Sequence, residues 1–363
     1  MTMKVTAVRS VLLGGLLLVG CSGSGDPSGY ASLEGLCMGT GWKATVAVPG
    51  GTSRSALKTV IQGRLDAVDL AMSTWKEDSD LSRLNRARVG EVVEVDPLTL
   101  NVVALCGPLI ELTGGAFDPT VGPLVRLWGF GSYDEVEAPS VEAVNSARGL
   151  VDWSAIEVLG SGLVRTRDGV ELDFSAVAKG YAVDLAAAAL LEAGCSSFLL
   201  EVGGEMVLRG KNAGGDPWRV GIDDPLPPAG SEANSPLNFA ARRPIARLSL
   251  SGKALATSGD YRNVREIDGR VVAHAIDPRT GQPINHNLAS VTVIAATCAE
   301  ADALATAALV LGAEGALILL EARPGVEGYL LSRVGSGADV TLKVTRTSGM
   351  KALEMAPVAT EAK

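Results

Sequence analysis

The chain has 363 residues, of which 47% are hydrophobic, and a formal net charge of −9 at pH 7. This length and composition allow a large buried core, so they exclude a disordered protein and leave room for one large domain or two. The acidic balance argues against nucleic-acid binding, which needs clustered lysine and arginine to neutralise phosphates. A negatively charged substrate would need a metal ion or a local basic patch.

The first twenty residues predict a secretory signal. Lys4 and Arg9 precede an apolar run, residues 11–19, that is too short to span a bilayer. The run ends in "LVGC", which resembles the lipobox of bacterial lipoproteins, so we expect a signal peptide over 1–20 and lipidation at Cys21. Lipidation would anchor the protein without spanning the membrane. An ordinary cleaved signal with an incidental cysteine is the alternative.

The rest of the chain predicts one folded domain. Residues 21–30 contain "SGSGDPSG" and indicate a flexible tether, and the domain is expected over 31–345. The stretch between Asp223 and Pro244 is rich in Pro, Ser and Ala and indicates a surface insertion between strands. Residues 346–363 lose hydrophobic periodicity, so a loose C-terminal tail is expected there.

The first half of the domain predicts helices with one hairpin. Apolar residues recur at helical spacing over 53–72, and 98–113 reads as a second helix ended by two glycines. Residues 115–131 combine Pro and Gly with Phe, Leu and Trp, which indicates a structured loop with a short helix. Two β-type runs flank Asp168-Gly169 and predict a hairpin over 163–174, followed by a helix over 179–193.

The second half predicts strands and a long helix. Strands are expected within 196–210, 218–224, 243–263, 269–284 and 289–298, and a helical pair split near Gly312 over 299–322. Interleaved helices and strands predict an α/β (α+β) fold, a single domain with mixed β-sheets flanked by helices. Apart from Cys21, the cysteines have apolar neighbours, which favours buried free thiols over disulfides at Cys37, Cys106, Cys195 and Cys298.

Standard catalytic signatures are absent from the sequence. It contains no Walker A motif, no HExxH, no GxSxG and no CxxC pair. With two histidines, His274 and His286, a histidine-based zinc site is disfavoured. Four aspartates stand beside small or turn-forming residues, where structural turns compete with a functional role: Asp118, Asp173, Asp260 and Asp277.

Asp302 and Thr306 form the more informative pair. They stand four residues apart in an otherwise apolar helix and so share a face. An ionised carboxylate among Ala, Leu and Val costs free energy unless something pairs with it, and magnesium prefers such oxygen ligands. The alternative stays open: an acid favoured by the helix dipole, with the threonine bonded back to its own helix.

His274 precedes Asp277 by three residues in a segment full of turn formers. A neutral histidine beside a carboxylate can act as a base or bind a phosphoryl oxygen. A buried, hydrogen-bonded structural histidine is the equally open alternative.

Eight motifs in a fixed order closely resemble the FAD:protein FMN transferases, the ApbE-type lipoproteins. The resemblance covers roughly residues 31–325 and agrees with the lipobox. The motifs are "MGTGW" at 38, "MSTWKEDSDLSRLN" at 72, "GAFDPTVGPLVRLWGFG" at 115, "DFSAVAKGYAVD" at 173, "LLEVGGEM" at 199, "ATSGDYRN" at 256, "HAIDPRTGQP" at 274 and "EADALATAALVLG" at 300.

The resemblance implies a magnesium-dependent flavin transferase. Such an enzyme takes FAD as substrate, splits its pyrophosphate, attaches FMN through a phosphodiester to a threonine of a target flavoprotein, and releases AMP. Implied targets are subunits of membrane redox complexes. The implied location is the bacterial cell envelope, lipid-anchored, on the periplasmic side of the inner membrane in preference to the outer. An FAD pyrophosphatase and a non-catalytic flavin-binding lipoprotein are the alternatives.

The resemblance also implies functional residues, carried over by position. The metal ligands would be the carbonyl oxygen of Ala176 and the side chains of Asp302 and Thr306. The general base would be His274 or a neighbouring aspartate such as Asp277. Two departures stand out: the insertion around 226–243 has no counterpart, and Ala299 stands where some relatives carry another acid. The implied FAD contacts are Met38, Trp75, Ala116, Phe117, Asp118, Asp173, Lys179 and the segment 274–276, with Ile276 at its end.

Overall fold

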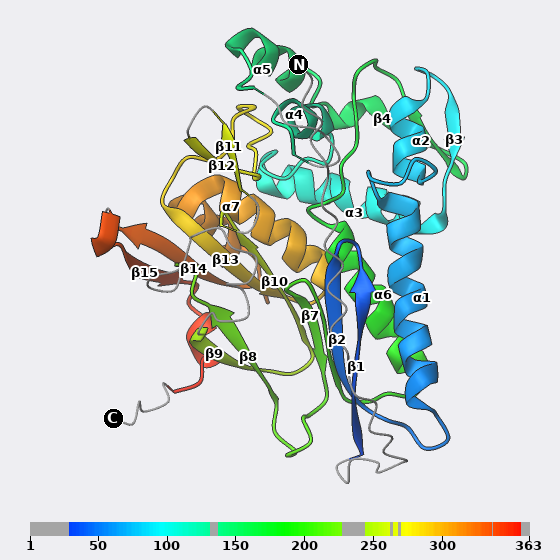
Figure 1. Ribbon diagram of the computed structural model, residues 1–363, viewed down its shortest axis with the longest axis vertical. Coiled ribbons are helices and arrows are strands. Elements are labelled where there is room, and N and C mark those ends of the chain that lie inside the picture. The colour runs from blue at the N-terminus through cyan, green and yellow to red at the C-terminus, as the bar shows by residue number, and fades with distance from the viewer. Residues whose placement is uncertain are drawn as a thin grey trace, which may run out of the picture.

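The computed structural model describes residues 29–130, 137–226, 244–261, 264–267, 270–335 and 337–356. The predicted leader, Cys21 and the tether up to residue 28 lie outside these ranges, and so do residues 227–243 of the insertion. Within them, an eight-stranded antiparallel sheet runs through the molecule (Figure 1). In spatial order its strands are β1 (Tyr30–Cys37), β2 (Thr40–Ala47), β6 (Phe198–Val202), β7 (Glu205–Arg209), β10 (Lys253–Gly259), β13 (Leu288–Ala295), β14 (Glu327–Val334) and β15 (Thr341–Arg346).

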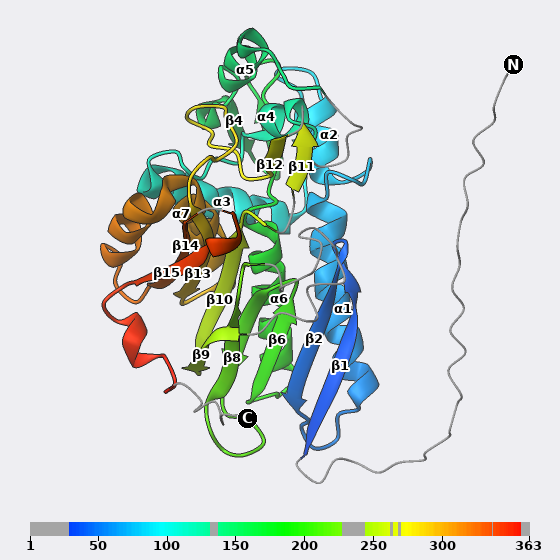
Figure 2. The same cartoon turned by 60° about the vertical axis from the view of Figure 1, so that its left-hand side comes forward.

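The sheet separates two hydrophobic cores, because successive side chains of a strand point to opposite faces. In β10, Ala254 and Ala256 belong to the larger core, whereas Leu255 belongs to the smaller one. Three helices cover the larger core: α1 (Arg54–Met72), α6 (Ala178–Glu192) and α7 (Cys298–Glu321). A separate hairpin of β8 (Trp218–Asp223) and β9 (Pro244–Leu250) covers the smaller core (Figure 2).

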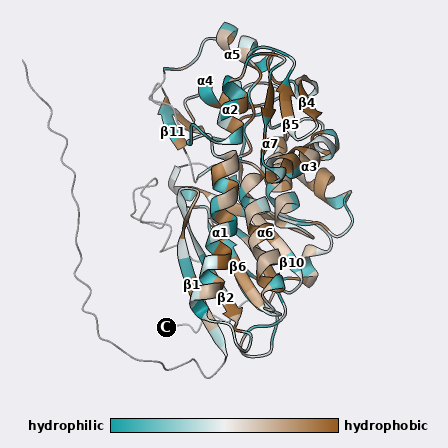
Figure 3. Ribbon diagram, turned by 90° about the vertical axis from the view of Figure 1, so that its right-hand side faces the viewer, coloured by the Kyte–Doolittle hydropathy of each residue, from teal (hydrophilic) through white to brown (hydrophobic). Residues whose placement is uncertain are grey.

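The helices follow their sequence patterns. Ser53 caps α1 by accepting a hydrogen bond from the Ala56 backbone N–H, and the apolar stripe of α1 is buried while its other side is hydrophilic (Figure 3). By length and composition α7 could cross a membrane, but it packs against β10, β13 and α6 as a core helix. The predicted break in α7 lies at Gly312, whose φ of 73° is left-handed.

A smaller layer lies above the sheet in Figure 1. It contains a third hydrophobic cluster formed by α4 (Gly122–Leu127), α5 (Val141–Arg148) and the segments around residues 267 and 276. A short 3-10 helix at 153–155 belongs to this layer, and two others lie on either side of β15 in the chain, at 337–339 and 350–352. The other elements of this layer are α2 (Asp80–Arg86), β3 (Val92–Glu94), α3 (Pro97–Thr113), β4 (Ile156–Leu159), β5 (Gly162–Arg165), β11 (Val264–Ile267) and β12 (Arg270–Ala273).

The predicted single α/β (α+β) domain is confirmed, as are the predicted helices. Among the described residues, the ladders between named strands are antiparallel, and a parallel pairing occurs as an isolated bridge between Val121 and Glu171. The four described cysteines are buried free thiols, as expected.

The predicted hairpin over 163–174 is wrong. Strand β5 pairs with β3 and β4, and the segment after Asp168-Gly169 does not return along it. Its backbone is hydrogen-bonded elsewhere: the side chain of Asn85 accepts from and donates to the backbone of Leu172. The N–H of Asp173 donates to the carbonyl of Pro119 at 2.7 Å. Tertiary partners therefore replaced the local turn pairing.

The predicted loose tail is wrong over residues 346–356. Strand β15 ends at Arg346, Met350 is fully buried in the smaller core, and the N–H of Met355 donates to the carbonyl of Arg247. This segment has few apolar residues and no periodicity. It is held in place because the smaller core, which other strands build, buries Met350. Residues 357–363 lie outside the described ranges.

Gly180 sets the distance between α6 and α7. A Cβ built on Gly180 would overlap the carbonyl oxygen of Cys298 and lie 2.8 Å from Cβ of Asp302. The N–H of Gly180 donates to Oδ2 of Asp302 at 3.0 Å. The two helices therefore cross in direct backbone contact at this residue.

Replacing Gly180 with alanine is expected to lower the free energy of unfolding by about 1–3 kcal/mol, because overpacking a tight contact forces the helices apart. Urea unfolding measures the change. Gly63→Ala is the matched control: Gly63 is an exposed glycine of α1 with open space around its Cβ position, so alanine should stabilise by about 0.5–1 kcal/mol. Equal losses in both variants would contradict a specific contact at Gly180.

Candidate active site

A cavity of about 480 Å³ lies between the smaller layer and α7. Segments that are far apart in the sequence supply its walls: the loop after α1, the loop before α4, the turn before α6, the end of β10, β11 and the segment after β12. Residues lining it are Thr74, Trp75, Ala116, Phe117, Asp118, Pro119, Val121, Val125, Phe130, Asp173, Ser175, Ala176, Ser258, Val264, Arg265, His274, Ala275, Ile276, Pro278, Thr306 and Leu309.

Two loops are joined to form one wall. The bridge between Val121 and Glu171 and the bond from Asp173 to the Pro119 carbonyl join residues 116–121 to residues 171–176. Asp118 accepts hydrogen bonds from the backbone N–H and hydroxyl of Thr120 at 2.8 and 2.6 Å. Burial raises the pKa of Asp118, and these two bonds oppose that rise.

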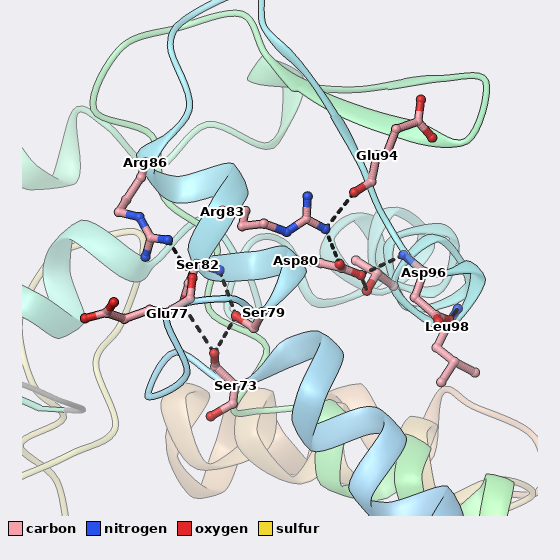
Figure 4. Close-up of polar contacts among 11 residues, drawn as sticks. Ser73, Glu77, Ser79, Asp80, Ser82, Arg83, Arg86, Glu94, Asp96 and Leu98 are labelled. Atoms are coloured by element: carbon pink, nitrogen blue, oxygen red, sulfur yellow. Dashed lines mark hydrogen bonds and ion pairs between the residues drawn. The ribbon is translucent and has the colours of Figure 1, made fainter.

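Trp75 stands at the rim, with 69% of its surface exposed. Its loop is tied to α2 because the hydroxyl of Ser79 donates to the Ser73 carbonyl at 2.7 Å (Figure 4). Asp80 anchors α2 in turn: its Oδ2 accepts from the Asp96 N–H and the Thr99 hydroxyl, each at 2.7 Å. The indole is thus an exposed flat surface on a well-supported loop.

His274 lies on another wall, after β12, with its ring edge-on to Phe130 at a centroid distance of 6.5 Å. A side chain from another segment holds the turn that follows His274: the indole N–H of Trp128 donates to the Gly281 carbonyl at 2.9 Å. Asp277 in this turn is not a lining residue. Its carboxylate accepts two bonds from the Arg279 guanidinium, each at 2.8 Å.

Charged groups cluster behind the cavity where α6 begins. Asp302 is 3% exposed, and burial raises the pKa of its carboxyl, while the nearby Lys179 ammonium and the Gly180 N–H oppose that rise. Nζ of Lys179 forms an ion pair with Glu205 at 2.7 Å. Asp184, one turn along α6, accepts from the Cys298 and Ala299 N–H groups at the start of α7, and burial raises its pKa to about 6.

The proposed cation ligands are compatible with a hard cation. Ala176 and Thr306 line the cavity, and Asp302 lies one helical turn before Thr306. Carbonyl, hydroxyl and carboxylate oxygens are the donors that magnesium prefers, and a buried carboxylate is stabilised by added positive charge. Among the residues described, no cluster of three or more His, Cys, Asp or Glu side chains occurs. The predicted ligand set contains one carboxylate, that of Asp302.

The structure brings most of the predicted site residues to one cavity. Trp75, three residues of the loop at 116–118, Asp173, Ala176, His274, Ile276 and Thr306 all line it. Lys179 and Asp302 lie behind it, Asp277 is held by Arg279, and Met38 lies in the β1–β2 turn with φ of 46°.

Sequence reasoning missed Ser258 and Arg265, which also line the cavity. Ser258 stands inside the motif "ATSGDYRN" at 256, where a serine followed by glycine is typical of a turn. A smaller polar pocket of about 240 Å³ adjoins the cavity and shares Thr74, Val125 and Asp173 with it.

The chain is similar to known flavin transferases along most of its length. A profile of the ApbE family matches residues 38–330. The FAD:protein FMN transferase of Klebsiella pneumoniae (strain 342) is 37% identical over 345 residues, covering 92% of this chain and 95% of that protein. That of Vibrio cholerae (O395) is 38% identical over 310 residues, covering 85% and 88%.

Solved structures agree with this assignment. The flavin transferase ApbE from Vibrio cholerae superposes with a TM-score of 0.77 at 34% identity and covers 89% of this chain and 99% of its own. The apo form of the Pseudomonas stutzeri flavinyl transferase ApbE gives the same score and identity over 91% and 98%. With the ordered motifs gathered around one cavity, these matches establish that the chain belongs to the ApbE family of flavin transferases.

Proposed function

We propose that the protein is a magnesium-dependent FAD:protein FMN transferase, which attaches FMN to a threonine hydroxyl of a target flavoprotein and releases AMP. One observation carries the proposal: six of the eight motifs, which are far apart in the sequence, contribute residues to one cavity. These residues include Trp75, Ala176 and His274. Relatives that share most of the chain carry this enzyme name.

The cavity has the chemistry to hold FAD. Trp75 offers an exposed flat face on which a flavin or adenine ring can stack, and the buried side chains of Phe117 and Ile276 make the wall beside it apolar. The pyrophosphate carries negative charge that an acidic protein holds poorly without a cation. Arg265 at the wall and Lys179 behind it are the nearby positive side chains.

The cation would be held by the carbonyl oxygen of Ala176 and the side chains of Asp302 and Thr306. When bound, magnesium would neutralise charge on the pyrophosphate and on the leaving AMP. Asp302 lies on α7, which is in close contact with α6 at Gly180. The hydrogen bond from the Gly180 N–H therefore holds the Asp302 carboxylate in position even without the cation.

The transfer step breaks the phosphoanhydride bond of FAD and forms a phosphoester bond to threonine. The threonine oxygen of the target attacks the phosphorus of the FMN half, the bond from that phosphorus to the bridging oxygen breaks, and AMP leaves with that oxygen. The hydroxyl proton needs a base, because a threonine hydroxyl is a poor nucleophile. His274 is favoured over Asp277 because His274 faces the cavity, whereas Arg279 occupies the Asp277 carboxylate.

The target segment needs a place beside bound FAD. The smaller pocket opens beside the cavity at Asp173, and hydroxyl, amide and charged side chains line it, which suits a polypeptide segment. We place the targets among flavoprotein subunits of membrane redox complexes. We further propose anchoring through a lipid on Cys21, on the periplasmic side of the inner membrane, supported by the lipobox sequence.

Purified protein with FAD, magnesium and an acceptor peptide should yield AMP and flavin-labelled threonine in equal amounts. Asp302→Ala is expected to abolish both products, because it removes the one carboxylate proposed for the cation. Mass spectrometry of the peptide and chromatography of AMP give the two yields. Glu314→Gln, an exposed acid further along α7, is the control and should retain activity. If the unmodified protein attached no flavin to the acceptor peptide, the proposal would be rejected.

Ala176→Leu is expected to reduce magnesium-dependent turnover about 100-fold, since a bulky side chain in the turn displaces the carbonyl oxygen from the cation. Thermal unfolding should show a much smaller change, because Ala176 is half-buried at the cavity, at the edge of the larger core. Ala188→Leu, at an exposed position of α6, the helix that follows this turn, should change neither quantity. Equal losses of turnover and stability would argue against this role.

His274→Ala is expected to lower the transfer rate about 100-fold, the usual contribution of a general base, while FAD still binds. Stopped-flow transfer rates and FAD titration separate the two effects. Two other functions give different results. A flavin-storage protein would bind FAD without splitting it, and His274→Ala would have little effect. A pyrophosphatase would release AMP without acceptor, at a rate that the acceptor does not change.

A further inference from the structure

Ser258 contacts the proposed cation site but has no assigned role. It lies near the end of β10, lines the cavity, and its hydroxyl is 3.2 Å from the hydroxyl of Thr306 on α7. This contact joins the sheet to the helix at the residue proposed to ligate the cation.

The backbone around Ser258 is firmly held. Ser258 pairs with Val291 in the sheet, and the N–H of Asp260, two residues on, donates to the Ala289 carbonyl. The carboxylate of Asp260 accepts two bonds from the Arg333 guanidinium at 2.5 and 2.7 Å. The Ser258 hydroxyl is therefore presented from a fixed strand end.

The hydroxyl pair has a preferred direction if Thr306 binds a cation. A hydroxyl has one proton and two acceptor lone pairs, so an oxygen that ligates a cation must direct its proton elsewhere. A threonine in a helix commonly donates to the carbonyl four residues earlier, here Asp302. Ser258 offers Thr306 a second acceptor at hydrogen-bonding distance.

We propose that Ser258 is a positioning residue of the cation site: it accepts the proton of Thr306 and so turns the Thr306 lone pairs toward the cation. Its own proton is then available to an anionic oxygen of the substrate in the cavity. This inference rests on the proposed function, because it assigns Ser258 a role only where Thr306 is a ligand.

The chain contains a matched control one residue away. Thr257 and Thr292 form a similar hydroxyl pair at 2.9 Å between β10 and β13. Adjacent residues of a strand point to opposite faces, so Thr257 faces the smaller core with Leu255, away from α7. Thr257→Val removes a hydroxyl pair from the same strand without touching the cavity.

The experiment compares Ser258→Ala, Ser258→Thr and Thr257→Val with the unmodified protein. Binding of Mn²⁺, a stand-in with the same ligand preference, is measured by electron paramagnetic resonance without FAD, and the KM for Mg²⁺ is measured in the transfer assay. Ser258→Ala should weaken Mn²⁺ binding and raise the KM for Mg²⁺ about 10-fold, the usual effect of removing a group that orients a metal ligand. Ser258→Thr, which keeps a hydroxyl, and Thr257→Val should resemble the unmodified protein.

Three results would overturn the inference. One is unchanged Mn²⁺ affinity and KM in Ser258→Ala while the unmodified protein still transfers FMN, which leaves the proposed function intact. Another is equal impairment in Thr257→Val and Ser258→Ala, which would indicate a general effect on β10. A third is impairment in Ser258→Thr as large as in Ser258→Ala, which would exclude the hydroxyl as the cause. Failure of the unmodified protein to use metal would reject both proposals together.

Discussion

The contact between α6 and α7 is the constraint on which the site depends. Gly180 lacks a Cβ, so the helices meet with its N–H bonded to the buried carboxylate of Asp302. One turn further along α6, Asp184 accepts from the two N–H groups that begin α7. Residues 180 and 184 share a helix face, so α7 is held at two points. This pairing sets where Asp302 and Thr306 stand relative to the turn at Ala176.

Around this pair of helices, the cavity is built from loops that are individually irregular but tightly held. The loop of Trp75 is tied to α2, the loop at 116–121 is bridged to 171–173, and Trp128 holds the turn after His274. The acceptors in these contacts are backbone carbonyls of Ser73, Pro119 and Gly281, which lie outside regular helices and strands. The rigid sheet and helices thus supply the frame, and the side chains that would contact substrate project from loops fixed against it.

Local sequence patterns predicted an element correctly where its backbone hydrogen bonds are made within the element itself, as in a helix. Helix periodicity located α1, and Gly312 located the break in α7. The same reasoning failed at 163–174 because Asn85 and Pro119, distant in sequence, replaced the expected strand partner. It failed at 346–356 because the apolar surface that holds Met350 belongs to other strands.

The sequence by itself determined the family, the order of the motifs and the spacing that puts Asp302 and Thr306 on one helix face, since these depend on residues close together in the chain or on their order. Only the tertiary structure decided which of these residues share a cavity. It placed His274 in the cavity and left Asp277 bound to Arg279, and it brought Ser258 from β10 to Thr306. Hydrogen bonds and packing between distant segments set these positions, and no local pattern encodes them.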